Sequence, residues 1–261
     1  MGERLSMEAD PEWAIEDASD VEGLTIAGAA LMVRATRLRG MDTADQVAVD
    51  SWAPYLACRD RAEEILRAAI DLRPGNGLAA AWFMASAVDS DDETKDQAAE
   101  VLNGADDVPI SGYSKLLSAR TEKWGGSHEA MWLVARRYAA VRAPWTKALV
   151  AKAHYEHWLY LAMMDERPEA AREAGIYFSN PVICNELVQI SEEISTAPPR
   201  DPYEVVYAHD VLAVVLAEAR MRRAAAAHLR KVGKHGDPAL LTGGPAWQRL
   251  LRQILKGLPP W

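Results

Sequence analysis

The sequence predicts an all-α protein built from stacked antiparallel helix pairs, and three observations lead to this fold class. The chain has almost none of the period-2 alternation of apolar and polar residues that half-buried strands show. Apolar residues recur instead at helical spacing, in runs rich in Ala, Leu, Arg and Glu. Prolines separate these runs at nearly regular intervals. We therefore expect helices along the whole chain and no sheet.

Turn-forming residues mark the boundaries of the expected helices. The stretch "RPGNG" at 73–77 ends one helix, and Pro109, Pro144, Pro181 and Pro238 mark other boundaries. Proline has this effect because it disfavours the helical conformation in the residue before it. The predicted helices cover residues 22–39, 45–72, 77–88, 93–103, 111–123, 128–141, 145–164, 168–177, 181–195, 203–219, 221–233 and 245–256.

The prolines also indicate a repeat. Pro74, Pro109, Pro144 and Pro181 are separated by 35, 35 and 37 residues. Helix pairs that recur about every 34 residues are typical of tetratricopeptide repeats, in which one pair cannot bury its apolar stripe without its neighbours.

The residues before Pro74 support the same interpretation. Ala62, Leu66 and Ala69 precede Pro74 by 12, 8 and 5 residues, which is the small, large, small, proline pattern of a tetratricopeptide second helix. The first-helix signature is degenerate in every repeat. We therefore predict a tetratricopeptide-like helical-repeat solenoid with a C-terminal capping segment. An irregular α-helical bundle remains the alternative.

Composition divides the chain into three parts. Residues 1–21 form an acidic N-terminal segment, 22–195 the helical repeats, and 196–261 a C-terminal helical pair with a capping helix. The stretch "STAPPRDP" at 195–202 is the clearest internal linker.

Charge and cysteine content narrow the possible functions. The 261 residues carry a formal net charge of −9. Nucleic-acid binding is not expected, because phosphate contacts require a basic excess. Cys58 and Cys184 lie far apart, which argues against a disulfide framework and a thiolate zinc site. The N-terminus lacks the basic and apolar regions of a signal peptide, and no apolar run is long enough for a membrane span. We expect a cytoplasmic protein.

Three stretches of the sequence carry a family resemblance. The first two are "GYSKLLSARTEKWGGSHEAMWLVARRYA" at 112–139 and "AKAHYEHW" at 151–158. The third lies upstream and is "SWAPYLACRDRAEEILRAAIDLRPGNGLAAAWFMASA" at 51–87. Together they resemble an uncharacterised, actinobacterial-type family of bacterial tetratricopeptide-like proteins. The resemblance implies helical repeats and a cytoplasmic location, and it implies no established reaction.

The stretch "EKWGGSHEAMW" at 122–132 is best explained as the turn inside a helix pair. Gly125 and Gly126 allow the positive φ of a left-handed helix cap, and Ser127 is a good N-cap for the next helix. Glu129 in the first turn suits the helix dipole. This interpretation needs no ligand.

A metal or catalytic site is the alternative. His154 and His157 share a helix face at i,i+3 spacing, which can place two imidazoles on one divalent transition metal. His128 and His209 could join them if successive helices converge, together with Glu156 or Asp210. The spacing is common by chance, and the sequence has no phosphate loop, dinucleotide fingerprint, nucleophile elbow or calcium loop.

Residues 220–235, "RMRRAAAAHLRKVGKH", form a local basic stretch without an acidic residue. Three interpretations stay open. It is an ordinary solvated helix face, a docking surface for the acidic N-terminal segment or an acidic partner, or a phosphate-binding surface.

We expect a module that binds a protein or peptide along a concave helical surface, and an enzyme is the less favoured option. A metal-dependent or metal-binding helical enzyme, and an accessory protein that binds a small ligand, are the alternatives. The residues expected to contact a partner, chosen from helix phase and from the basic stretch, are Tyr113, Lys115, Arg120, Lys123, Tyr155, Tyr207, Arg222 and Arg223.

Overall fold

The computed structural model describes residues 19–40, 47–198 and 200–232, and this part of the chain is all-α, as predicted. It holds eleven α-helices, two 3-10 helices and no strand, and its one β-bridge joins Asn76 to Asp106. Among these helices, none combines the length and the apolar character that crossing a membrane requires.

The chain divides into two compact units, residues 1–119 and 120–261. This division falls inside the array predicted for 22–195. The predicted linker at 195–202 does join two helices, which end at Thr196 and begin at Pro202. The domain boundaries at 21/22 and 195/196 stay predictions.

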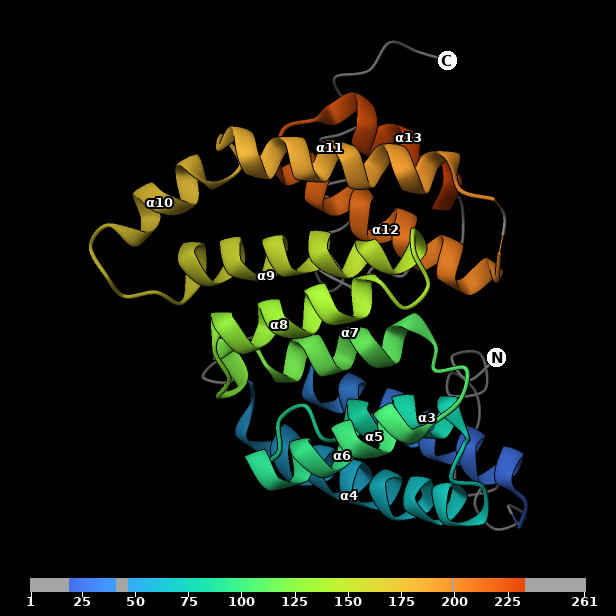
Figure 1. Cartoon of the computed structure of the whole chain (residues 1–261). Coiled ribbons are helices and arrows are strands. Elements are labelled where there is room, and N and C mark those ends of the chain that lie inside the picture. Colours follow the sequence, from blue (N-terminus) through green and yellow to red (C-terminus); the bar gives the residue numbers. More distant parts are fainter. Residues whose placement is uncertain (1–18, 41–46, 199, 233–261) are drawn as a thin grey trace. The chain divides into compact units, whose positions relative to one another are not determined.

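The first unit is built around a short apolar helix (Figure 1). Its helices are α3 (Val21–Arg39), α4 (Val49–Leu72), α5 (Gly77–Ser86), α6 (Asp92–Gly104) and α7 (Ile110–Ala119). Helix α5 packs against α3, α4, α6 and α7. It is apolar on every side, so it lies in the core rather than at the surface.

The second unit is built around two such helices, α9 and α12. Its elements are η1 (Glu122–Trp124), α8 (His128–Ala139), η2 (Trp145–Lys147), α9 (Ala148–Met163), α10 (Ala170–Tyr177), α11 (Pro181–Thr196), α12 (Pro202–Glu218) and α13 (Arg222–Val232). Helix α9 packs against α8, α10, α11 and α12, and α12 also packs against α11 and α13.

The observed helices follow the predicted ones closely, with two instructive differences. The helix predicted for 111–123 ends at Ala119, because the carbonyls of Arg120 and Thr121 bond the amides of Ser127 and Gly126 in the next turn. The helix predicted for 145–164 begins with the 3-10 turn η2. Residues 1–18 of the acidic segment predicted for 1–21, and the helix predicted for 245–256, lie outside the described residues.

The two central helices of the second unit are enclosed by their neighbours. Residues Ala148–Glu156 of α9 and Tyr207–Leu216 of α12 are continuous buried runs. A surface helix would expose every third or fourth side chain. The side chains of these runs are therefore not available to a partner, which bears directly on the concave binding surface expected from the sequence.

Candidate functional site

Three of the four histidines predicted as metal ligands lie in one group in the second unit. His128 begins α8, and His154 and His157 lie on α9. Their rings pack with those of Trp132, Tyr160 and Tyr177 from α8, α9 and α10. We call these six residues the histidine cluster.

The glycine turn before α8 positions His128. Gly125 has a φ of 84°, the left-handed conformation expected for the cap. A Cβ on Gly126 would lie 2.2 Å from the carbonyl oxygen of Arg120, so this position is glycine because of space, not because of positive φ. The Ser127 hydroxyl accepts a hydrogen bond of 3.1 Å from the Ala130 amide, which confirms the predicted N-cap.

His128 and His157 stack on one another. Their ring centroids are 4.0 Å apart and their planes differ by 10°. The indole N–H of Trp132 donates to Nδ1 of His157 over 3.5 Å. Burial, with a smaller contribution from the neighbouring His128 and His154, lowers the pKa of His157 to about 4. His157 is therefore neutral at pH 7, with Nδ1 as its acceptor nitrogen.

Both ring nitrogens of His154 have partners from helices distant in the sequence. Nε2 lies 2.8 Å from Oε2 of Glu186 on α11, and Nδ1 lies 3.0 Å from the Tyr177 hydroxyl. Arg136 forms a two-pronged ion pair with Glu186 and lowers the pKa of that carboxyl. An ionised carboxylate can only accept, so Nε2 of His154 carries the proton and Nδ1 accepts from Tyr177.

Burial lowers the pKa of His154, while Glu186 opposes this shift. Neither nitrogen of the neutral ring offers a free lone pair to a metal in this arrangement.

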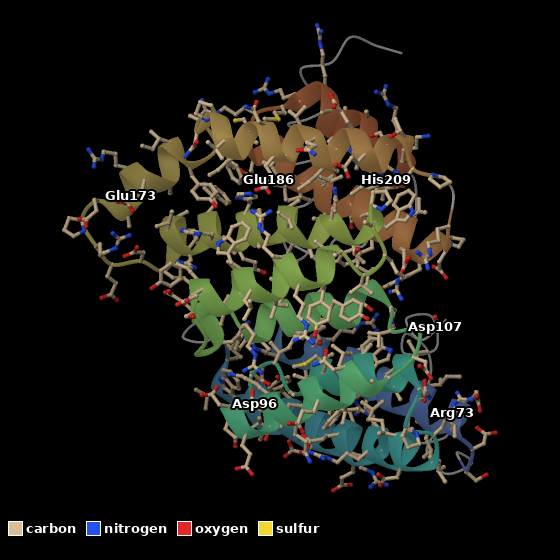
Figure 2. The ribbon with its side chains drawn as sticks, viewed as in Figure 1. Arg73, Asp96, Asp107, Glu173, Glu186 and His209 are labelled. Carbon is tan, nitrogen blue, oxygen red and sulfur yellow. The ribbon has the colours of Figure 1, made fainter. Side chains whose placement is uncertain are left out.

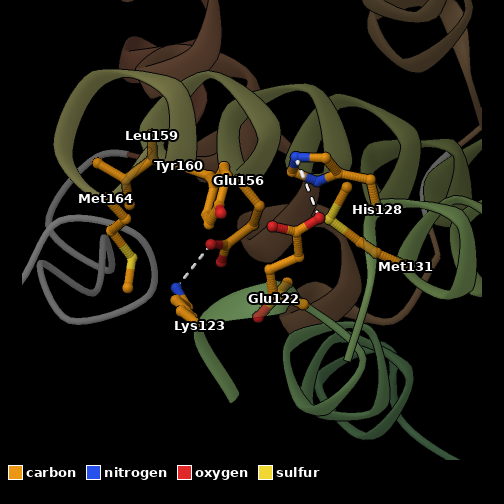
Figure 3. Close-up of a pocket in the computed structure, with 9 residues that line it drawn as sticks. Glu122, Lys123, His128, Met131, Glu156, Leu159, Tyr160 and Met164 are labelled. Atoms are coloured by element: carbon orange, nitrogen blue, oxygen red, sulfur yellow. Dashed lines mark hydrogen bonds and ion pairs between the residues drawn. The ribbon is translucent and has the colours of Figure 1, made fainter. Parts of the chain in front are cut away.

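A small pocket opens beside the cluster (Figure 3). Lys123 and Glu156 form an ion pair of 2.6 Å, and Nε2 of His128 lies 3.7 Å from Oε1 of Glu122. The pocket measures about 240 Å³ including its open mouth, and its enclosed part holds little more than one water molecule. The pocket is lined by Thr121, Glu122, Lys123, His128, Met131, Glu156, Leu159, Tyr160 and Met164.

His209, the fourth predicted ligand, belongs to a different group, and Figure 2 labels it on α12. Its Nδ1 lies 2.7 Å from Nδ1 of His228 on α13, and its ring packs edge-on against Trp145. Nε2 of His228 lies 2.8 Å from the Ser191 hydroxyl of α11. All three polar side chains of this chain of hydrogen bonds are buried.

The structure gives the metal hypothesis no geometric support. Across residues 19–40, 47–198 and 200–232, no three or more His, Cys, Asp or Glu side chains are grouped so that they could hold a metal ion. Metal binding by His128, His154, His157 and His209 stays a hypothesis, to be tested by direct measurement.

The residues predicted to contact a partner differ in how far their side chains are exposed to solvent. Tyr113, Tyr155 and Tyr207 lie in the core, where their rings cannot reach a partner, so a partner surface has to be sought on other residues. Lys123 is half-buried in its ion pair with Glu156. Arg120 is partly exposed, and the exposed members of the set are Lys115, Arg222 and Arg223.

Four residues that organise these sites could not be chosen as site residues from the sequence motifs: Arg136, Tyr177, Glu186 and His228. Only for His228 does the sequence pattern indicate burial. It shares a helix face with Ala225 and Val232 at i, i+3 and i+7 spacing, and this face is buried. For the others, no local pattern links a residue on α8, α10 or α11 to His154.

Comparisons with protein families, with curated proteins and with solved structures find no match to this chain. The resemblance to a bacterial tetratricopeptide-like family therefore stays a prediction, and function has to be argued from the geometry alone.

Proposed function

We propose that the chain is a tetratricopeptide-like scaffold that binds a protein or peptide partner. The observation that carries the proposal is the order of helix packing within each unit. In a tetratricopeptide array, the first helix of each pair contacts its own second helix and the first helix of the next pair. In the first unit, α5 contacts both α3 and α7, while α4 and α6 contact the helices that precede and follow them.

The second unit shows part of the same order. Helices α9 and α12 contact one another as successive first helices. Helix α9 also contacts α8, α10 and α11, and α12 also contacts α11 and α13, so two helices rather than one separate α9 from α12 in the chain. These repeated contacts support a repeat array over an irregular bundle.

The surface that this scaffold offers a partner lies on the second helices of the second unit. Arg136 joins α8 to α11 through Glu186, and Ser191 joins α11 to α13 through His228, so side chains link these three helices. We call these linked second helices the outer layer. Two of its aliphatic side chains are largely exposed: Leu133 on α8 is 70% exposed and Val182 on α11 is 75% exposed.

Leu133 and Val182 occupy equivalent places on the outer layer. Leu133 precedes Arg136 by one helical turn, and Val182 precedes Glu186 by one turn. Helices α8 and α11 run in the same direction in Figure 1, so both positions lie toward the amino-terminal end of their helix from the ion pair. Exposed apolar side chains are a common feature of protein-binding surfaces.

Site-specific photo-cross-linking in cells tests the proposal. A photoreactive residue would replace Leu133 or Val182 in the full-length chain, with the exposed Leu78 at the start of α5 as the control position. We expect one cross-linked partner common to positions 133 and 182 and absent at position 78. Equal products at all three positions, or none at any, would contradict a partner on the outer layer.

The metal-dependent alternative is tested separately by elemental analysis of untagged protein purified without a chelator. Near-stoichiometric zinc, iron, copper or manganese that disappears in the His154→Ala, His157→Ala double variant would favour that function over the scaffold. For location, we propose the cytoplasm, and the two free thiols of Cys58 and Cys184 are compatible with a reducing compartment.

A further inference from the structure

The exposed side of α13 carries several basic side chains and no acidic one. Three arginines stand at its start, Arg220, Arg222 and Arg223, and Arg230 and Lys231 stand in its last turn. All five side chains are exposed, and no acidic residue occurs between Ala219 and Val232. We call these five residues the basic face.

The position of the first three arginines is electrostatically unfavourable for the helix itself. The amino-terminal end of a helix carries a partial positive charge and favours acidic side chains, as Glu204 illustrates in the first turn of α12. In the part of the chain that the structure describes, Arg220, Arg222 and Arg223 form no ion pair that would offset this. Arg220 also has a φ of 61°, a conformation that residues other than glycine seldom adopt.

Packing fixes which way the basic face points. Ala225, Ala226, His228 and Val232 form the buried side of α13, which packs against α12, and His228 bonds both His209 of α12 and Ser191 of α11. The opposite side therefore faces outward. It presents Arg223 and Arg230 two turns apart, about 10 Å along the axis at 1.5 Å per residue.

The middle of the basic face carries a small side chain. Ala227 is exposed and follows Arg223 by four residues, so it lies one turn along the same side of α13. A chain lying along this face would meet charged groups at both ends and no bulky side chain in the middle. Arginine suits this role because its planar group can donate two parallel hydrogen bonds to one carboxylate.

We propose that the basic face of α13 binds an acidic peptide segment of the partner. This inference rests on the proposed scaffold function and deepens it, since α13 is part of the outer layer. A carboxylate-bearing peptide fits the observations better than a nucleic acid does. A long polyanion would have to approach a chain whose net charge is −9, whereas a short acidic segment needs only the local field of the basic face.

Fluorescence anisotropy with a short fluorescein-labelled peptide rich in glutamate tests the inference on the full-length chain. The test variant is Arg222→Glu, Arg223→Glu. The matched control is Arg61→Glu, Arg172→Glu, which changes the net charge equally at exposed arginines on α4 and α10. The milder Arg222→Gln, Arg223→Gln variant removes the charges without reversing them. Far-UV circular dichroism checks that each variant keeps its helical fold.

We expect the peptide to bind about tenfold or more weakly to the test variant and about as tightly to the control as to the wild type. The affinity of the wild type should fall as salt is raised, and the slope should be shallower in the glutamine variant. Three results would overturn the inference: no binding of the acidic peptide, equal weakening in both charge-reversed variants, or tighter binding of a single-stranded oligonucleotide than of the peptide.

The photo-cross-linking experiment separates this inference from the scaffold proposal. The cross-links from positions 133 and 182 would be measured again in the Arg222→Glu, Arg223→Glu variant. If they are undiminished, the scaffold proposal stands, but the basic face is not a contact of the partner. Loss of these cross-links in the test variant but not in the matched control would support both.

Discussion

Lowering the pH should destabilise the second unit through the buried imidazole pair of His209 and His228. Burial is the main cause that lowers the pKa of both rings to about 4, with a smaller contribution from Lys231 for His209 and from His209 for His228. The unfolded chain has ordinary imidazoles with a pKa near 6.5 and therefore binds more protons between these values. Stability must then rise with pH across this window and fall as pH drops below about 6.5.

The size of the effect follows from the two pKa values. A single imidazole that titrates at about 4 when folded and about 6.5 when unfolded lowers the free energy of unfolding by about 2 kcal/mol between pH 7 and pH 5. The geometry adds a second cost. The Nδ1 atoms are 2.7 Å apart, so one of them must accept, and protonating both rings removes that hydrogen bond. We expect the pair to lose at least this amount.

Urea unfolding at pH 7, 6 and 5, followed by tryptophan fluorescence, measures the effect. Trp145 packs edge-on against His209 and reports on this region. The double variant His209→Phe, His228→Leu removes both titrating rings and should lose much of the change in stability with pH. His157→Leu is a comparison variant: it removes one histidine whose pKa is also lowered to about 4 and leaves the pair intact, so it should remove only the share of one ring. If the double variant and the wild type lose stability equally between pH 7 and pH 5, the reasoning is wrong.

Three further predictions test local packing and capping. Gly126→Ala should strongly destabilise the protein or shift the turn before α8, because the added Cβ would collide with the backbone of Arg120. Gly104→Ala should be close to neutral, because the space around its Cβ is open. Thermal unfolding measures both variants, and equal effects would contradict the close approach at Gly126. Ser127→Ala should cost about 1 kcal/mol through the lost cap, and a urea midpoint unchanged from wild type would show that the cap contributes nothing. Phe83→Ala, at a fully buried position of α5, should lower the free energy of unfolding by about 3–5 kcal/mol. Leu133→Ala, at an exposed position of α8, should change it little. Similar losses in urea unfolding would show that α5 is not in the core.

Helix positions were predictable because their signals are local. Ser127 caps α8, and Pro181 and Pro202 begin α11 and α12 in the first turn, where proline has no amide to lose. Gly126 shows the limit of local reasoning. Its glycine was assigned to backbone freedom, but the reason is the carbonyl of Arg120 across the turn, which no sequence pattern reports.

The candidate sites were predictable only in part. Helical spacing placed His154 and His157 on one helix, and the structure does bring His128 against His157. The partners that decide what these rings can do, Tyr177 and Glu186, come from other helices. The predicted binding residues Tyr155 and Tyr207 are buried, because α9 and α12 are enclosed on nearly every side by neighbouring helices, including at polar positions such as His154 and His209.

The sequence by itself determined that the chain is helical, where its helices begin and end, and that α13 carries a concentration of arginine. Each of these depends on residues within a turn or two of one another. Only the tertiary structure decided that His209 faces His228, that Glu186 binds Arg136 and His154, and that Tyr207 lies in the core. The physical reason is that burial and proton location depend on which helix packs against which. That choice is made by side chains far apart in the chain, through contacts that no local periodicity encodes.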